Sequence, residues 1–231
     1  MSKLKKKMIA LLFAALALLL FWILRGGSYS DEQIKYISKL EKFRAEKNIE
    51  FRDSPNSPFN SKRKVEFHPL KYFDANFNFI FTGKLVENNI KDTIKVFGTK
   101  GEERKSVRYG VLKLQNEKYK LDVNVYETLA QDGITKYYSI WFTDKTTNDE
   151  SYGVGRYLNF ELNDNPDFIY TVDFNYAYNP YCAYNSDYSC AIPTKEDYLD
   201  IAIEAGEKKF HEWTGCWMLD TGYLMCAVHY L

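Results

Sequence analysis

The feature that most constrains the fold is a series of short segments in which apolar residues recur at every second position. Tyr119, Leu121, Val123 and Val125, for example, alternate strictly with polar neighbours. This period is typical of a strand with one face buried and one face in water. Seven such segments, rich in aromatic and β-branched residues, occupy residues 77–85, 92–99, 107–114, 119–127, 135–143, 155–162 and 168–175.

The connections between these segments are short and contain turn-forming residues. They include Asn88-Asn89, Lys100-Gly101, Asp132-Gly133 and the stretch 163–167. Short connections of this kind join antiparallel neighbours. We therefore predict a mainly β domain in which about seven to nine antiparallel strands form a sandwich or a partly open barrel.

Two helices are expected to flank the strands. Residues 30–54 combine a capping box at Ser30 and Gln33 with apolar residues at three-residue steps, and prolines follow them. A second helix is predicted after the last strand, because Thr194 is a suitable cap and acidic residues follow it. Gly206 is a suitable end for it.

The N-terminus has the pattern of a membrane anchor. Four lysines within residues 3–7 precede an uncharged apolar run from Met8 to Leu24, which Arg25 closes. As a helix the run would be about 25 Å long, at the short end of what crosses a bilayer. The lysines favour the cytoplasm, so we expect an anchored domain on the extracytoplasmic (periplasmic) side, with the membrane as a partner. A cleaved signal peptide and a secreted domain are the alternative.

These patterns divide the chain into four parts. Residues 1–29 are the cytoplasmic lysines with the anchor or signal segment, 30–54 the amphipathic helix, 55–208 the β domain with its C-terminal helix, and 209–231 an extension of unknown role. The extension is aromatic and has no clear period, so an added strand and an irregular segment are both open.

Composition excludes two classes of protein. Aromatic residues make up 17% of the chain and hydrophobic residues 45%, which excludes a disordered chain. The net charge is zero, but the five basic residues of the first 25 positions leave the remainder at −5. A mildly acidic domain without a basic stripe is a poor binder of nucleic acid, and we predict no nucleic-acid partner.

The four cysteines suggest a disulfide rather than a metal site. Cys182 and Cys190 are close together in a loop between two prolines, whereas Cys216 and Cys226 lie in the tail. Sequence alone does not choose among the three possible pairings, but export favours disulfides, and we expect one between Cys182 and Cys190. Zinc would need further ligands at suitable spacing, so no metal and no cofactor is predicted.

A candidate site follows from pairing the last two strands as a hairpin. A turn centred on Asn165 would place Leu158 opposite Val172 and Phe160 opposite Tyr170. This register predicts that Tyr157 faces Asp173.

Arg156 would then point inward at the start of its strand, where it needs a carboxylate partner. Asp144, Asp149 and Glu150, in the loop before it, are the nearest candidates. The stretch DFNYAYNPYCAY, residues 173–184, leaves the sheet at the same end. The ligand-binding candidates are Arg156, Tyr157, Asp173, Asn175, Asn179 and Glu150.

Several ordered blocks of sequence resemble one family. They are FTDKTTNDESYGVGRYL at 142–158, DFNYAYNPYCAY and IEAGEK at 203–208, together with FHPLKYF at 67–73 and YGVLKL at 109–114. These blocks are similar to the family catalogued as domain of unknown function number 1684. The resemblance covers roughly residues 43–208 and implies an exported or anchored prokaryotic protein, without an established activity, cofactor or partner.

Three functions are compatible with these residues. We expect binding of a small polar or anionic envelope ligand, or of a glycan, through the candidates above. The alternatives are a hydrolase that uses Asp173 and Glu150 as a carboxylate pair, and a structural protein in which the same groups are buried and bonded to one another. The acidic loop 144–150 fits a calcium-binding loop poorly, because the expected Gly and Glu are absent. No enzyme class is assigned.

Overall fold

The predicted strands form one curled antiparallel sheet. The computed structural model describes residues 29–129, 133–211, 214–218 and 224–228. The sheet contains eight strands in the order β6-β5-β4-β3-β1-β7, with β2 beside β3 and a short parallel β8 beside β5. Their bounds are β1 (Ile80–Glu87), β2 (Thr93–Phe97), β3 (Glu103–Gln115), β4 (Lys120–Leu129), β5 (Lys136–Asp144), β6 (Arg156–Phe160), β7 (Tyr170–Asp173) and β8 (Tyr198–Leu199).

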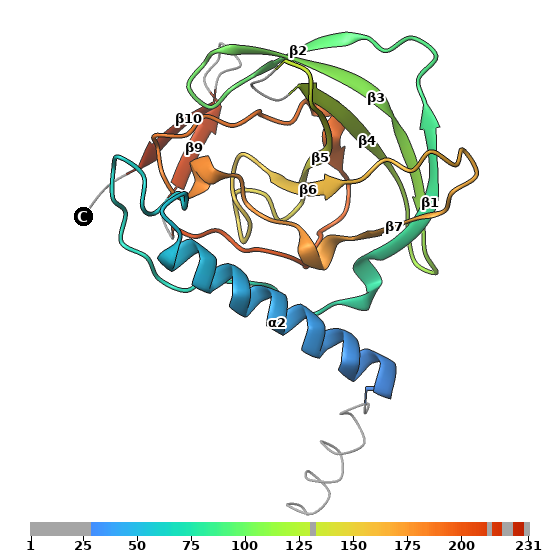
Figure 1. The fold of residues 1–231 in the computed structure, drawn as a ribbon, viewed down its shortest axis with the longest axis horizontal. Helices are drawn as coiled ribbons and strands as arrows, with labels where there is room; N and C mark the ends of the chain where they lie inside the picture. Colours follow the sequence, from blue (N-terminus) through green and yellow to red (C-terminus); the bar gives the residue numbers. More distant parts are fainter. Residues whose placement is uncertain (1–28, 130–132, 212–213, 219–223, 229–231) are drawn as a thin grey trace, which may run out of the picture. The chain divides into compact units, whose positions relative to one another are not determined.

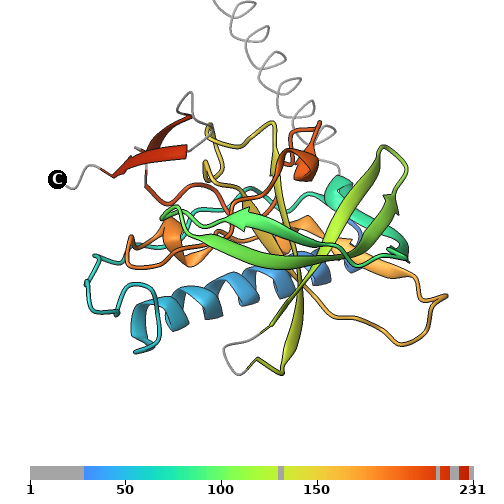
Figure 2. The same cartoon turned by 90° about the horizontal axis from the view of Figure 1, so that it is seen from above.

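The curl of the sheet encloses an apolar core. Figure 1 shows the strands from β1 to β5 curving around one face, and Figure 2 shows the twist of the long strands β3 and β4. Along β4, Leu121, Val123 and Val125 are buried while Lys120 and Asp122 are exposed. The period-two pattern therefore correctly identified the buried face, and the partly open barrel is confirmed as a curled half-barrel.

The predicted pairing of the last two strands is wrong. β6 pairs with β5 and β7 pairs with β1, so the two strands form opposite edges of the sheet. Asp173 lies opposite Ile80 in the register, not opposite Tyr157. The rings of Phe160 and Tyr170 still meet across the open edge, 4.8 Å apart. The parity of the apolar residues was correct, but it does not determine which strand is the neighbour.

The N-terminal helix is confirmed and the C-terminal one is wrong. Helix α2 spans Asp31–Asp53, and its capping box is present: the amide of Gln33 donates to Oγ of Ser30 at 3.2 Å, and the amide of Ser30 donates to Oε1 of Gln33 at 2.9 Å. The described chain divides into two compact units whose boundary is Glu41/Lys42, within this helix. Everything described below belongs to the unit that starts at Lys42.

After Thr194 the chain forms one 3-10 turn, η4 (Lys195–Asp197), and then runs extended. Leu199, Ile203 and Ala205 are buried and their neighbours at 200, 202 and 204 are exposed. This alternation covers the core with an extended segment, which a helix of the same sequence could not do. Burial of these side chains therefore overrides the helix propensity of the segment.

The membrane-spanning part of the predicted fold class also needs correction. Within the described ranges, α2 is the single α-helix, and no helix there is long and apolar enough to cross a membrane. The predicted anchor, Met8–Leu24, falls among residues 1–28, outside the described part of the chain.

The tail contains a small hairpin. Strands β9 (Thr214–Met218) and β10 (Leu224–Val228) pair antiparallel. Their backbone register places position 216 opposite position 226. Of the two possibilities left open for the tail, added strands are therefore correct.

Candidate functional site

The predicted centre of the site, Arg156, is fully buried in the structure. Its Nη2 donates to Oδ2 of Asp144 at 2.7 Å. The side chains of both residues are 0% exposed. The guanidinium donates further to the carbonyl oxygens of Ile203 (2.9 Å), Ala205 and Glu207 (3.4 Å). Burial lowers the pKa of Arg156, and the charge of Asp144 opposes that shift. Arg156 thus joins β6 to the extended segment after β8.

Asp144 is held by its own loop as well as by Arg156. Its Oδ1 accepts from the amide of Thr146 at 2.7 Å and from the Thr146 hydroxyl at 2.6 Å. A carboxylate with these partners has a structural role, because both of its oxygens are bonded within the fold. Among the three acidic candidates proposed from the sequence, Asp144 is the partner of Arg156.

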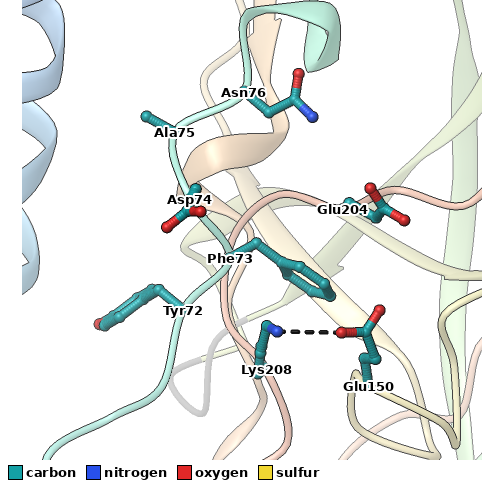
Figure 3. Close-up of a pocket in the computed structure, with 8 residues that line it drawn as sticks. All are labelled: Tyr72, Phe73, Asp74, Ala75, Asn76, Glu150, Glu204 and Lys208. Atoms are coloured by element: carbon teal, nitrogen blue, oxygen red, sulfur yellow. Dashed lines mark hydrogen bonds and ion pairs between the residues drawn. The ribbon is translucent and has the colours of Figure 1, made fainter. Parts of the chain in front are cut away.

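A pocket opens beside this buried pair. It has a volume of about 410 Å³, and Figure 3 shows the residues that line it. We call it the carboxylate pocket, because three of its side chains are carboxylates and one is an ammonium group. Its lining residues are Tyr72, Phe73, Asp74, Ala75, Asn76, Glu150, Glu204 and Lys208.

An ion pair forms part of the lining of the carboxylate pocket. Nζ of Lys208 lies 3.1 Å from Oε1 of Glu150, and the two side chains are 34% and 44% exposed. The same ammonium lies 4.5 Å from the ring centroid of Phe73, and Cζ of the buried Arg156 lies 5.6 Å from that centroid. The Phe73 ring therefore contacts both the buried ion pair and the charged group of the pocket.

Main-chain hydrogen bonds hold the walls of the pocket together. The amide of Phe73 donates to the carbonyl of Gly206 at 2.9 Å, and the amide of Lys208 donates to the carbonyl of Lys71 at 2.9 Å. The amide of Lys209 donates to the carbonyl of Glu150, also at 2.9 Å. Three segments far apart in the sequence are thereby held in one arrangement.

Gly206 is required where its segment passes close to a fourth one, around Ala177. Its φ is +77°, and an added Cβ would lie 2.5 Å from the carbonyl oxygen of Ala177. A residue with a side chain would meet both a strained backbone conformation and a clash with backbone.

Two of the predicted ligand-binding residues, Asn175 and Asp173, hold the backbone of Asn76 in the pocket wall through hydrogen bonds. Oδ1 of Asn175 accepts from the amide of Asn76 at 2.8 Å, and its Nδ2 donates to the Asn76 carbonyl at 3.0 Å. Oδ1 of Asp173 accepts from both the amide and Nδ2 of Asn175, each at 2.9 Å. Asn175 is 1% exposed, so it positions Asn76 and offers a ligand no open polar atom.

Asn179 supports the opposite wall in the same way. It is 1% exposed, and its Nδ2 donates to the carbonyl of Lys208 at 2.8 Å. Its amide donates at 2.8 Å to Oε2 of Glu207, a buried carboxylate that also accepts from Tyr184 and pairs with Lys47 at 2.7 Å. The main chain of Lys208 is therefore held in place by the buried side chain of Asn179.

Tyr157 lies away from the carboxylate pocket. Its hydroxyl donates to the carbonyl of Ala191, and its main chain pairs with that of Tyr178. Burial raises the pKa of this hydroxyl. One of the six predicted residues, Glu150, lines the carboxylate pocket. Four are buried or bonded behind its walls: Arg156, Asp173, Asn175 and Asn179. The sixth, Tyr157, lies elsewhere.

Sequence reasoning missed Phe73, Asp74, Glu204 and Lys208. A signal was present, because the blocks FHPLKYF and IEAGEK, which resemble family sequence, contain or adjoin all four. What the sequence does not reveal is that residues 72–76 and 204–208 lie side by side.

A second groove lies between the two edge strands and is distinct from the carboxylate pocket. It has a volume of about 460 Å³ and is lined mainly by β6 and β7 and by the segments next to them, including Asp173 and Tyr176. Glu150 and Asp173, the predicted carboxylate pair, therefore line two different cavities. Across the described ranges, no group of three or more His, Cys, Asp or Glu is arranged to hold a metal ion.

Comparison with known proteins identifies relatives without a known function. A family model described as "Protein of unknown function (DUF1684)" matches residues 65–208, which include every residue that lines the carboxylate pocket. The solution NMR structure of an uncharacterized protein of Haloarcula marismortui is similar at 25% sequence identity and a TM-score of 0.57, and the match covers 80% of this chain and 100% of that one. No curated protein matches.

Proposed function

The chain belongs to the DUF1684 family of proteins of unknown function, and from the geometry of the carboxylate pocket we propose that it binds a small ligand that carries hydroxyl or amino groups. A neutral or amine-bearing sugar unit is the class that fits best. The observation that carries this proposal is the composition of the lining, with three carboxylates, one ammonium, one amide and two aromatic rings around one opening.

The charge of the lining favours one class of ligand. Asp74, Glu150 and Glu204 outnumber Lys208, and Lys208 is already paired with Glu150. An anionic ligand would be repelled by the unpaired carboxylates, while hydroxyl and ammonium groups would donate to them. The anionic class among the ligands expected from the sequence depended on Arg156, which is buried and paired with Asp144.

The Lys208–Glu150 pair is exposed enough for a ligand to rearrange it. An ion pair in contact with solvent contributes about 0–1 kcal/mol, so a hydroxyl group that bonds both partners replaces it at little cost. The ring of Phe73 beside it offers an apolar surface to the carbon face of a sugar. The fixed main chain around the pocket limits the entropy lost on binding.

Two alternatives receive less support. The hydrolase that uses Glu150 with Asp173 would need both carboxylates at one bond, and they line different cavities. A purely structural protein agrees with the burial of Arg156, Asn175 and Asn179, but it does not account for the open carboxylate pocket beside them. The extracytoplasmic location rests on the first 25 residues of the sequence and stays a prediction.

Three pyranose sugars that differ mainly in charge test the proposal. Glucosamine, glucose and glucuronate would be titrated into the purified chain in a calorimeter and in a thermal-shift assay. We expect glucosamine to bind best, glucose more weakly and glucuronate not at all. Equal binding of glucuronate, or no binding of any of the three, would contradict the proposed ligand class.

Matched substitutions place any binding in the pocket. Glu150→Gln removes one carboxylate without changing its shape and should weaken glucosamine binding at least about tenfold, because a hydrogen bond to a charged group contributes about 1.5–3 kcal/mol. Lys84→Met is the control, since Lys84 forms a 2.8 Å ion pair with Asp167 outside the pocket. If Glu150→Gln and Lys84→Met bind equally well, the site is elsewhere.

A further inference from the structure

Two cysteine thiols lie close together outside the carboxylate pocket. Cys182 belongs to the 3-10 turn η3 (Tyr181–Ala183), and Cys190 lies eight residues further along. The amide of Cys182 donates to Sγ of Cys190 at 3.3 Å. Both residues are free thiols and half-buried, so the disulfide expected between them is absent from this structure.

The surroundings of the two sulfur atoms are unequal. The hydroxyl of Tyr152 lies 3.4 Å from the carbonyl oxygen of Cys182 and 3.8 Å from its Sγ, and it donates to both. Donation from the Cys190 thiol, with smaller contributions from Tyr152 and Thr99, lowers the pKa of Cys182. The pKa of Cys190 is raised, because its proton is held by Cys182 and its sulfur is shielded from water. Negative charge is therefore favoured on the sulfur of Cys182 over that of Cys190. The amide of Cys182, which donates to the Cys190 sulfur, opposes this difference without reversing it.

The main chain around the pair is fixed independently of the sulfur atoms. The amide of Thr99 donates to the carbonyl of Cys190 at 3.0 Å, and the amide of Cys190 donates to Oγ1 of Thr99 at 3.2 Å. The amide of Ile192 donates to the carbonyl of Phe97 at 2.8 Å. These bonds join the cysteine loop to the turn between β2 and β3. A change in the bonding of the sulfur atoms therefore leaves the loop attached.

We propose that Cys182 and Cys190 form a redox-active dithiol that exchanges with small-molecule disulfides, with Cys182 as the attacking sulfur and Cys190 as the resolving one. In the first step the Cys182 thiolate attacks one sulfur of the disulfide, a mixed disulfide forms, and one thiolate leaves. In the second step Cys190 loses its proton and attacks the sulfur of Cys182, which forms the Cys182–Cys190 bond and releases the second thiolate. The protein loses two electrons and two protons, and the small disulfide gains them.

The test uses the full chain with Cys216→Ser and Cys226→Ser, so that the two remaining thiols are those of the pair. Oxidised glutathione is added, the reaction is quenched with acid, and the protein is weighed by mass spectrometry. We expect a product that has lost two hydrogens and retains no glutathione. Reduced glutathione should return it to the dithiol, since exchange is reversible.

Single substitutions separate the two roles. In the same background, Cys190→Ser should trap glutathione on Cys182, and Cys182→Ser should react at least about tenfold more slowly, as expected for a thiol with a higher pKa. Tyr152→Phe should slow the reaction of the Cys190→Ser variant, because it removes one donor to the thiolate. In urea the variants should react at similar rates, which shows that the differences arise from the fold.

Two results would overturn the proposal. One is equal reactivity of the Cys182→Ser and Cys190→Ser variants in the folded state. The other is an oxidised pair that reduced glutathione fails to open, which would identify a purely structural disulfide.

Discussion

The buried ion pair between Arg156 and Asp144 should contribute far more to stability than an exposed pair of the same geometry. The two substitutions are Asp144→Asn, which keeps the shape and removes the charge, and Arg156→Met, which keeps most of the volume and removes the donors. Both side chains are 0% exposed, so solvent screens their interaction little.

The magnitudes follow from what each change leaves behind. Removing one partner of a buried pair typically costs about 3–5 kcal/mol. Asp144→Asn belongs at the lower end, because Arg156 keeps the carbonyls of Ile203 and Ala205. Arg156→Met belongs at the upper end, because it leaves the buried carboxylate of Asp144 without its cation and those carbonyls without a donor. The double variant should cost about 2 kcal/mol less than the sum, since neither charge is then left alone.

Urea unfolding of the four proteins measures these free energies. The control is the pair Lys84–Asp167, whose N–O distance of 2.8 Å nearly equals the 2.7 Å of the buried pair but whose side chains are 50% and 84% exposed. Lys84→Met and Asp167→Asn should each cost less than about 1 kcal/mol. If Asp144→Asn costs no more than Asp167→Asn, the assignment of Arg156 as a structural anchor is refuted.

Two further predictions concern backbone strain and pH. Gly206→Ala should lower the free energy of unfolding by more than about 1 kcal/mol. Gly101 also has a positive φ, but an added Cβ there would have no atom within 4 Å, so Gly101→Ala should cost less. Equal losses in urea unfolding would show that the contact with the Ala177 carbonyl is unimportant. A hydrogen bond from Ser189, with a smaller contribution from a neighbouring arginine, lowers the pKa of Glu102 from 4.5 to about 2. The stabilising contribution of the Glu102 carboxylate is therefore present above pH 4.5 and is lost as the pH falls towards 2. The difference in Tm between the parent and Glu102→Gln should shrink across that interval. A constant difference would contradict this linkage.

The strands could be predicted from sequence because their burial is local. Leu121, Val123 and Val125 alternate with polar residues, and this pattern has one interpretation. The segment after η4 was mistaken for a helix, although Leu199, Ile203 and Ala205 also share one parity. Capping and acidic residues near Thr194 suggested a helix, and burial against the core determined the outcome.

The partners of edge strands could not be predicted from the same pattern. Phe160 and Tyr170 share a face whether their strands pair with each other or lie across an open seam. The choice depends on how strongly the whole sheet curls, which is a property of all its strands. The local hairpin was therefore the natural expectation and was wrong.

The candidate site was predictable only in part. The need of Arg156 for a nearby carboxylate follows from its parity, and Asp144 was among the residues expected to meet it. The carboxylate pocket depends on contacts between residues 72–76 and residues 204–208, which are more than a hundred positions apart in the sequence. No spacing rule connects such segments, so Lys208 could not be assigned to a site before the fold was known.

The central claim is that the carboxylate pocket binds a neutral or amine-bearing sugar. The most direct measurement is a titration of the isotopically labelled chain with glucosamine, followed through its backbone amide NMR signals. We predict that the largest shifts occur at residues 73–76, at Glu150 and at residues 204–208. Shifts concentrated at residues 158–176, or none at saturating sugar, would contradict the claim.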